Sequence, residues 1–240
     1  MVIERKKEMT VGVICALAIE VEGLKAVMKQ KTEKAGARMT YTQGTIGGVQ
    51  AVAVECGIGK VNAAICAQQM IDLFKPDMII NSGIAGALSG QIGIADIVIA
   101  NDVVQHDMDG TAMGDPLGEI WFHDEKRIEI PADTNIVERL KQACSSLKDT
   151  KVMLGRIATG DVFVAGKEKR RAIYDHFGAL ACEMEGGAIG QVCYRNGVPF
   201  GILRCISDDI TENEFMDYLK FREIAAKKSI AIIQAFLSQL

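Results

Sequence analysis

The feature that most constrains the fold is an alternation along the chain between short apolar runs and longer segments with helical periodicity. Runs rich in Val and Ile are typical of strands buried on both faces, in sheets that helices cover on both sides. The predicted strands are residues 11–18, 51–56, 78–81, 96–100, 152–158, 179–182 and 200–206. The predicted helices are residues 20–30, 61–74, 135–147, 167–177, 187–196 and 216–240. We therefore predict an α/β fold with a mixed, mostly parallel central sheet flanked by helices.

The length of 240 residues suits one large α/β domain, whose core buries roughly 70% of the surface of the unfolded chain. We predict a charged N-terminal extension over residues 1–9 and a single domain over residues 10–240. Residues 105–131 carry Gly, Pro and Asp with little periodicity. We expect this segment to leave the sheet, because long loops of this kind are often functional or interfacial.

Composition excludes several classes of function. The formal net charge of -4 argues against a nucleic-acid-binding protein, since such proteins are usually basic. No apolar segment long enough for a signal peptide or a membrane span follows the charged start, so we expect a cytoplasmic protein that does not bind membranes. The seven cysteines lack the spacing of a zinc or redox motif, and the three histidines are scattered. We expect reduced, buried cysteines, no metal site and no cofactor.

Polar residues follow the predicted strands at the point where each strand ends. Ligands of open α/β sheets bind outside the carboxyl ends of the strands, so these segments are expected to meet in one pocket. They are Glu20, Gly57 to Lys60, Ser82 to Gly86, Thr159 to Phe163, Glu183 to Glu185, and Ser207 to Asp209.

The sequence Glu183-Met184-Glu185 ends a short apolar run and precedes a helical pattern. A buried carboxylate without a partner costs several kcal/mol, so a polar group should meet these side chains. Carboxylates accept hydrogen bonds, and the paired hydroxyls of a sugar are natural donors to them. The alternative is that both glutamates only begin a helix, where negative charge suits the helix dipole.

Arg204 lies inside an apolar strand that ends at Asp208. A buried arginine needs an anionic or carbonyl partner, which Glu20, Glu183 or Glu185 could supply. This places a cation beside Asp208, a candidate general acid. The alternative is a purely structural ion pair. Glu20 alone would be an ordinary residue of a first helical turn, but together with the other strand ends it is a candidate base.

Two glycine-rich segments need separate interpretation. Residues 57–62 lack the third glycine of a dinucleotide site and the wider spacing of a P-loop. We interpret them as a sharp turn from strand to helix that lets a ligand or another backbone approach closely. Residues 82–87 are predicted to form a second small-residue turn between strand and helix. The small residues of this turn would either allow tight packing of the helix on the sheet or leave backbone N–H groups facing a substrate.

These segments occur in the order seen in one family. The chain resembles the 5'-methylthioadenosine/S-adenosylhomocysteine nucleosidases of the nucleoside phosphorylase and hydrolase superfamily, from Thr10 to the C-terminal helix. The resemblance implies a nucleoside phosphorylase-like fold and irreversible hydrolysis of an N-glycosidic bond, with release of adenine and a 5-thioribose. It rests on residues 11–20, 57–64, 81–86, 160–163, 182–186 and 206–208, taken together and in register.

The resemblance also implies roles for individual residues. Glu20 resembles the base that activates water, and Asp208 the acid that protonates adenine N7. A ribosyl cation-like transition state needs a protonated leaving base, nearby negative charge and a held water, which such residues supply. The positions with implied substrate-binding roles are Ile84, Met113, Phe163 (stacking on adenine), Val164 (backbone contacts to the base), Glu183, Met184 (under the sugar), Glu185 (ribose hydroxyls), Arg204 (near Glu185 and the water) and Ser207 (supporting Asp208).

The chain departs from the family at the pocket. Ile84 stands where family members commonly have Ser, Leu17 stands near a position that commonly has a larger aromatic residue or Met, and Met113 often has an aromatic counterpart. In the family, a partner subunit's loop usually completes the pocket for the 5'-substituent, so the resemblance implies a homodimer in which the loop around Met113 has this role. These differences leave open hydrolysis of 6-amino-6-deoxyfutalosine. A phosphate-dependent purine nucleoside phosphorylase is a second alternative, although isoleucine is a poor anion ligand at position 84. A non-catalytic nucleoside-binding module is a third, against which both Glu20 and Asp208 argue.

Overall fold

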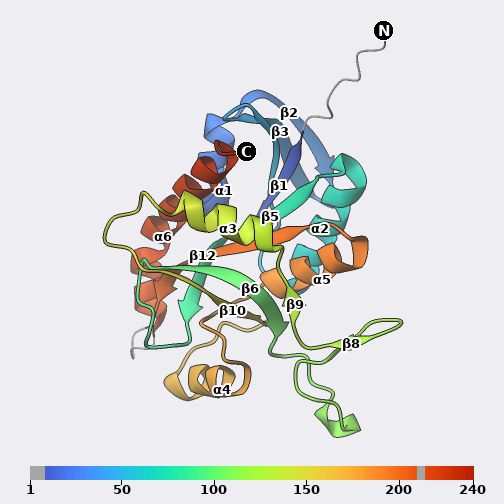
Figure 1. Ribbon diagram of the computed structural model, residues 1–240, viewed down its shortest axis with the longest axis vertical. Coiled ribbons are helices and arrows are strands. Elements are labelled where there is room, and N and C mark those ends of the chain that lie inside the picture. The colour runs from blue at the N-terminus through green and yellow to red at the C-terminus, as the bar shows by residue number, and fades with distance from the viewer. Residues whose placement is uncertain (1–8, 210–213) are drawn as a thin grey trace.

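The computed structural model describes residues 9–209 and 214–240, and it consists of one extended sheet with helices on both faces (Figure 1). The strands of the main sheet run in the order β11-β10-β6-β12-β5-β1-β4-β3-β2, with β9 paired to β6. Their bounds are Thr10–Cys15 (β1), Lys29–Gly36 (β2), Met39–Ile46 (β3), Val49–Glu55 (β4), Met78–Ala87 (β5), Ile97–Gln105 (β6), Ile130–Pro131 (β9), Val152–Thr159 (β10), Ala181–Glu183 (β11) and Phe200–Asp208 (β12).

The sheet is mixed. Strand β1 pairs in parallel with both β4 and β5, and β12 is parallel to β5, so these strands end at one edge. Antiparallel pairs occur where β12 meets β6 and where β3 meets β4. Strand β11 is parallel to β10 and antiparallel to β5, which curls this half of the sheet back on itself. The curl brings the ends of β5, β11 and β12 close together.

The helices form two layers. Helices α1 (Ala18–Val27) and α3 (Thr134–Ala143) each pack against α6 (Glu214–Leu237) on one side of the sheet. Helices α2 (Lys60–Phe74) and α5 (Gly186–Asn196) pack together on the other side, and Figure 1 shows the sheet between the two groups. Helix α4 (Lys167–Phe177) covers the end of the sheet where β10 finishes (Figure 1). The predicted α/β class, with a mixed central sheet flanked by helices, is therefore confirmed.

One pair of strands contradicts the sequence analysis. The predicted helix 20–30 ends at Val27, and β2 and β3 follow as an antiparallel hairpin over a stretch in which we predicted no strand. Strand β2 reads Lys-Gln-Lys-Thr-Glu-Lys-Ala-Gly and is exposed over almost its whole length, so hydrophobic periodicity gave no signal. It is an edge strand, and charged residues on such a strand oppose further pairing.

A second prediction is wrong at residues 82–87. They form no turn into a helix, because they are the second half of β5, and they are buried. The glycines there make room for charged side chains. A Cβ on Gly83 would lie 2.3 Å from Arg204 Nη1 and 2.7 Å from Glu20 Oε1, and a Cβ on Gly86 would lie 2.7 Å from Asp208 Oδ2. The small residues thus admit three ionisable groups to the surface of the sheet.

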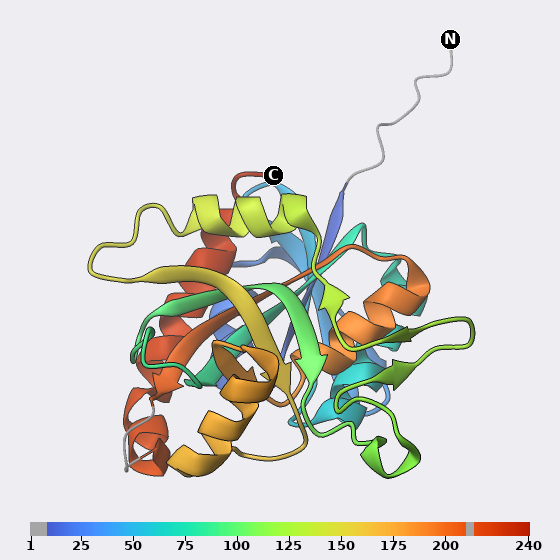
Figure 2. The ribbon, with the colours of Figure 1, turned by 60° about the horizontal axis from the view of Figure 1, so that its bottom comes forward.

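Most of residues 105–131 leave the main sheet, as expected, but Gln105 still belongs to β6, and Ile130 and Pro131 return to the sheet as β9. After β6 ends at Gln105, the chain forms a short 3-10 helix, η1 (Thr111–Met113), and the hairpin of β7 (Ile120–Trp121) and β8 (Lys126–Arg127). Figure 2 shows this excursion extending away from the helical layers. The expected extension, residues 1–9, lies outside the described residues except for Met9. No helix in the described ranges is long and apolar enough to span a bilayer.

Candidate active site

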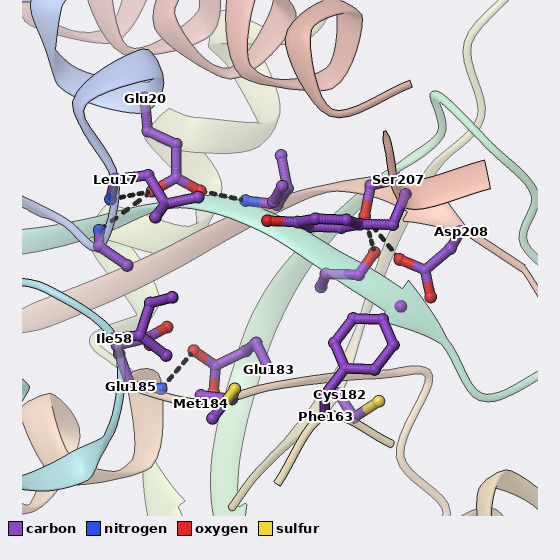
Figure 3. A pocket seen from close by; sticks show the side chains of 15 residues that line it. Leu17, Glu20, Ile58, Phe163, Cys182, Glu183, Met184, Glu185, Ser207 and Asp208 are labelled. Atoms are coloured by element: carbon purple, nitrogen blue, oxygen red, sulfur yellow. Dashed lines mark hydrogen bonds between the residues drawn. The ribbon is translucent and has the colours of Figure 1, made fainter. Parts of the chain in front are cut away.

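A pocket lies where the sheet edge formed by β5, β11 and β12 meets the start of α1 (Figure 3). The predicted convergence of strand ends is therefore seen in the structure. Of the residues predicted from the sequence, those that line this pocket are Glu20, Ile84, Phe163, Glu183, Met184, Glu185, Ser207 and Asp208.

Glu20 forms one side of the pocket and is 2% exposed. Its Oε2 accepts hydrogen bonds from the N–H groups of Ala16 (3.0 Å) and Leu17 (2.9 Å), and its Oε1 accepts one from Ile84 N–H (3.0 Å). The bonds from Ala16 and Leu17 also cap the start of α1, so the helix-start interpretation of Glu20 is correct as well. Burial raises the pKa of Glu20, while Arg204 and the three N–H groups oppose this increase. The result is a rigid carboxylate with raised basicity.

Asp208 lies on another side of the pocket, well apart from Glu20 (Figure 3). Ser207 Oγ donates a hydrogen bond to its Oδ1 (2.6 Å), and the guanidinium of Arg170 pairs with its Oδ2. Arg170 is 1% exposed and also donates to the carbonyl oxygens of Ala87 (2.8 Å) and Val164 (3.2 Å). A buried carboxylate is stable only with such partners. Arg170 therefore fixes the orientation of Asp208 relative to β5 and the loop after β10.

The third wall is the turn between β11 and α5. The guanidinium of Arg204, 1% exposed, bonds to Glu183 and to Asn81, and its Nη2 lies 3.8 Å from Glu185 Oε2. The partners anticipated for Arg204 are thus Glu183 and Glu185. Glu183 Oε2 also accepts the N–H groups of Glu185 (3.0 Å) and Gly186 (2.7 Å). Glu183 therefore serves to shape the turn at the start of α5.

Glu185 is held differently from Glu183. Its Oε1 accepts the N–H of Gly59 at 2.9 Å, and Arg204 remains outside hydrogen-bonding distance of Oε2. Burial, followed by the charge of Glu183, raises the pKa of Glu185 to about 7. A carboxylate with spare acceptor capacity at the pocket wall can bind hydroxyl donors.

Three predicted positions lie elsewhere. Val164 lines a smaller cavity that adjoins the pocket beside Asp208. Arg204 stands behind the carboxylates and does not line the pocket. Met113 is 77% exposed at the tip of η1 and does not line the pocket of its own chain.

The sequence analysis assigned no site role to several residues. Tyr218 of α6 lines the pocket, and its ring lies edge-on to Phe163 with centroids 5.7 Å apart; Ile58 and Leu17 also line it, Leu17 beside the position where a departure from the family was noted. Ile58 belongs to a turn that we did predict to approach a ligand, so its position carried a signal. Arg170 carried none, because it stands in the cation-rich run Lys167-Glu168-Lys169-Arg170-Arg171.

Comparison with known proteins fits this geometry. Residues 10–238 match the phosphorylase superfamily. The nucleosidase of Shewanella sediminis is 35% identical over 97% of this chain and 100% of its own length. The enzyme of Geobacillus thermodenitrificans is 36% identical over 96% of this chain and 97% of its own length. Both relatives are named 5'-methylthioadenosine/S-adenosylhomocysteine nucleosidase.

Solved structures agree with the sequence relatives. The Neisseria meningitidis nucleosidase in complex with methylthio-immucillin-A has a TM-score of 0.91 and 32% identity, over 96% of this chain and 99% of that one. Futalosine hydrolase of Helicobacter pylori has a TM-score of 0.90 and 28% identity, over 97% and 98%. By its fold and its pocket, the protein is a member of the phosphorylase superfamily. Within that superfamily, the chain belongs to the 5'-methylthioadenosine/S-adenosylhomocysteine nucleosidase family.

Proposed function

We propose that the protein hydrolyses the N-glycosidic bond of 5'-methylthioadenosine and S-adenosylhomocysteine, releasing adenine and the 5-thioribose. The observation that carries this proposal is the placement of two buried carboxylates, Glu20 and Asp208, on separate sides of one pocket, with Glu185 on its third wall. Two carboxylates in different surroundings suit the roles of base and acid.

The reaction follows from that placement. Asp208 gives its proton to adenine N7 while the bond between C1' and N9 breaks and its electron pair passes to the base. Glu20 takes a proton from a water molecule, whose oxygen bonds to C1'. The ionised carboxylates of Glu20 and Glu185 stabilise the positive charge that develops on the ribosyl ring. Glu20 then releases its proton to solvent and Asp208 takes one up, so each proton is accounted for without a cofactor.

Substrate binding uses the rest of the pocket. Phe163 and Val164 contact adenine, Met184 lies under the sugar, and Glu185 accepts hydrogen bonds from the ribose hydroxyls. Ser207 orients Asp208 through the bond to Oδ1. Arg204 keeps the two glutamates of the β11–α5 turn in place.

Water, in this proposal, is the nucleophile in preference to phosphate. The side chain at position 84 is the apolar Ile, and Arg204 is already paired with carboxylates. A phosphate dianion would meet Glu20 and Glu185 with no unpaired cation among the pocket-lining residues, which disfavours its binding.

A homodimer and a cytoplasmic location complete the proposal. Apolar side chains are exposed on two segments, namely Ile58, which lines the pocket, and Val61 near the start of α2, and Met108 and Met113 on the excursion. A second copy of the chain would cover them, and its Met113 would meet the 5'-substituent. All seven cysteines are free and buried, as suits a reducing compartment.

The test is release of adenine from 5'-methylthioadenosine with and without inorganic phosphate. We expect equal rates and free 5-methylthioribose in both. Dependence on phosphate, with a sugar 1-phosphate as product, would identify a phosphorylase, and binding without turnover would identify a binding module. Because futalosine hydrolase is among the similar structures, 6-amino-6-deoxyfutalosine should be assayed in parallel. A higher kcat/KM for 6-amino-6-deoxyfutalosine than for 5'-methylthioadenosine would show that the proposed substrate is wrong.

A further inference from the structure

Three charged residues form a closed ring beside the pocket, at the N-terminus of α2. Lys60 Nζ pairs with Asp107 Oδ1 at 2.7 Å, Asp107 Oδ2 accepts the N–H of Asp161 at 2.8 Å, and Asp161 Oδ1 accepts the N–H of Lys60 at 2.7 Å. Lys60 Nζ also donates to Gln105 Oε1 at 3.2 Å. We call Lys60, Asp107 and Asp161 the Lys60 ring.

The ring joins three segments that are distant in sequence. Lys60 follows Gly59, whose N–H binds Glu185. Asp161 precedes Phe163 by two residues on the loop after β10. Asp107 stands at the start of the excursion that carries Met113. The ring therefore connects a ribose-binding carboxylate, the adenine-stacking loop and the segment proposed to reach a second copy.

The local backbone is built around the ring. Gly59 has a φ of +98°, which glycine adopts without strain, and a Cβ there would lie 3.1 Å from Asp161 Oδ1. Gly160 packs against His106, since a Cβ on Gly160 would lie 2.4 Å from His106 Nε2. His106 N–H also donates to Thr159 O at 2.9 Å, which ties the ends of β6 and β10 together.

The charges of the ring are stabilised in place. Burial opposes the ionised form of Asp107, but the hydrogen bonds from Lys60 and Asp161 outweigh it and lower the pKa of that carboxyl below its usual range. The side chains of Lys60 and Asp107 are 19% and 27% exposed, so water screens the pair only in part.

We propose that Lys60, Asp107 and Asp161 are positioning residues that couple the excursion to the substrate site. When a second copy holds the excursion in place, the hydrogen bonds of the Lys60 ring also restrict the positions of Phe163 and Glu185. Dimerisation and adenine binding therefore strengthen each other. This inference rests on the proposed function and adds to it the residues that link the subunit interface to the base.

The test uses Lys60→Met and Asp107→Asn, with Lys25→Met as the matched control. Like Lys60, Lys25 pairs with a carboxylate, that of Glu22, and its side chain is 18% exposed. It lies on α1, outside the Lys60 ring. Both ring variants should raise KM for 5'-methylthioadenosine about tenfold with a smaller change in kcat, because they loosen groups that hold the substrate in ground and transition states alike. The double variant should be no worse than the stronger single variant, and the control should match wild type.

The coupling between dimerisation and adenine binding is measured by the effect of adenine on the dimer dissociation constant. Adenine should tighten the wild-type dimer in sedimentation equilibrium, and by reciprocity the ring variants should lose that effect. Asp161→Asn, which keeps the shape and the acceptor oxygen, serves if Lys60→Met fails to fold, and it should reduce the linkage in the same direction. Wild-type KM and intact linkage in folded ring variants would overturn the inference. Failure of the wild-type enzyme to release adenine would instead overturn the proposed function.

Discussion

The inner wall of the pocket and its mouth are built in opposite ways. Glu20, Arg204 and Asp208 on the inner side are 1–2% exposed, and backbone or side-chain partners hold each of them. At the mouth, Ile58 is 52% exposed and Phe163 43%, and Met113, on the excursion proposed to reach a second copy, is 77% exposed. The chemical groups are thus preorganised within one chain, whereas the surface that would meet the 5'-substituent is left uncovered.

This difference separates two kinds of effect. Buried charges depend on one another, so changes on the inner side should affect catalysis or folding strongly. Changes at the mouth should act on binding and on association, with the chemistry left intact.

The largest effect is expected from Glu20→Gln. The amide keeps the shape and can still interact with the start of α1, but it cannot accept a proton from water. Loss of a general base costs ~10²–10⁴-fold in kcat. Single-turnover release of adenine measures this loss, and thermal unfolding checks that the fold is kept. An unchanged kcat would exclude Glu20 as the base.

Arg170→Met tests the inner side through stability. The variant leaves Asp208 buried without its counter-charge, and breaking a buried pair costs about 3–5 kcal/mol. Urea denaturation should show this loss, and Asp208→Asn in the same chain should recover part of it. Arg171→Met is the control, because its side chain is 73% exposed and it pairs with Asp175 on the surface. Equal stability of the two single variants would mean that the buried pair contributes nothing.

Asp208→Asn should separate binding from catalysis. The asparagine can hydrogen-bond to adenine but cannot supply a proton. Adenine should therefore bind within about 1–2 kcal/mol of wild type, while kcat falls by at least ~10²-fold. A substrate whose base departs without protonation should regain much of the rate. Equal loss of binding and turnover, or equal slowing of both substrates, would make Asp208 a structural residue.

The same contrast explains what the sequence could predict. The core strands and the helices appear as apolar runs and periodic segments, and α4 has the predicted bounds, Lys167–Phe177. The polar strand ends were predictable because parallel strands end at a common edge. The hairpin of β2 and β3 was not, since an exposed edge strand needs no apolar residues.

Side-chain partners were harder to predict than positions. Arg204 was recognised because a single cation in an apolar strand needs a partner, and its anionic partners are two of the three glutamates considered, while Asn81 is a further partner. Arg170 was not recognised, because nothing in a charged helix shows which cation points inward. The glycines of residues 82–87 were assigned to a turn, although their actual role is to admit Glu20, Arg204 and Asp208.

On the excursion, Met113→Glu should weaken the dimer or raise KM for substrates with bulky 5'-thio groups by about tenfold, equivalent to about 1.4 kcal/mol. A charge in an apolar contact must be desolvated, which opposes association. Sedimentation gives the oligomeric state, and KM values for 5'-methylthioadenosine and S-adenosylhomocysteine give the substrate dependence. A fully active wild-type monomer would contradict the role given to this loop.

The smallest effect concerns Glu185, which lies between the inner wall of the pocket and its mouth. Its pKa is raised to about 7 by burial and by the charge of Glu183. Above that pH the ionised carboxylate accepts hydrogen bonds from the ribose hydroxyls, so KM should fall as pH rises through 7, by less than about tenfold. Because its pKa in the folded state exceeds that of the unfolded chain, Glu185 contributes stability that is present below about pH 4.5 and is lost as pH rises towards 7. In Glu185→Gln both trends should flatten while kcat keeps the pH dependence set by Glu20. A variant whose KM still titrates near pH 7 would assign that ionisation to another group at the mouth.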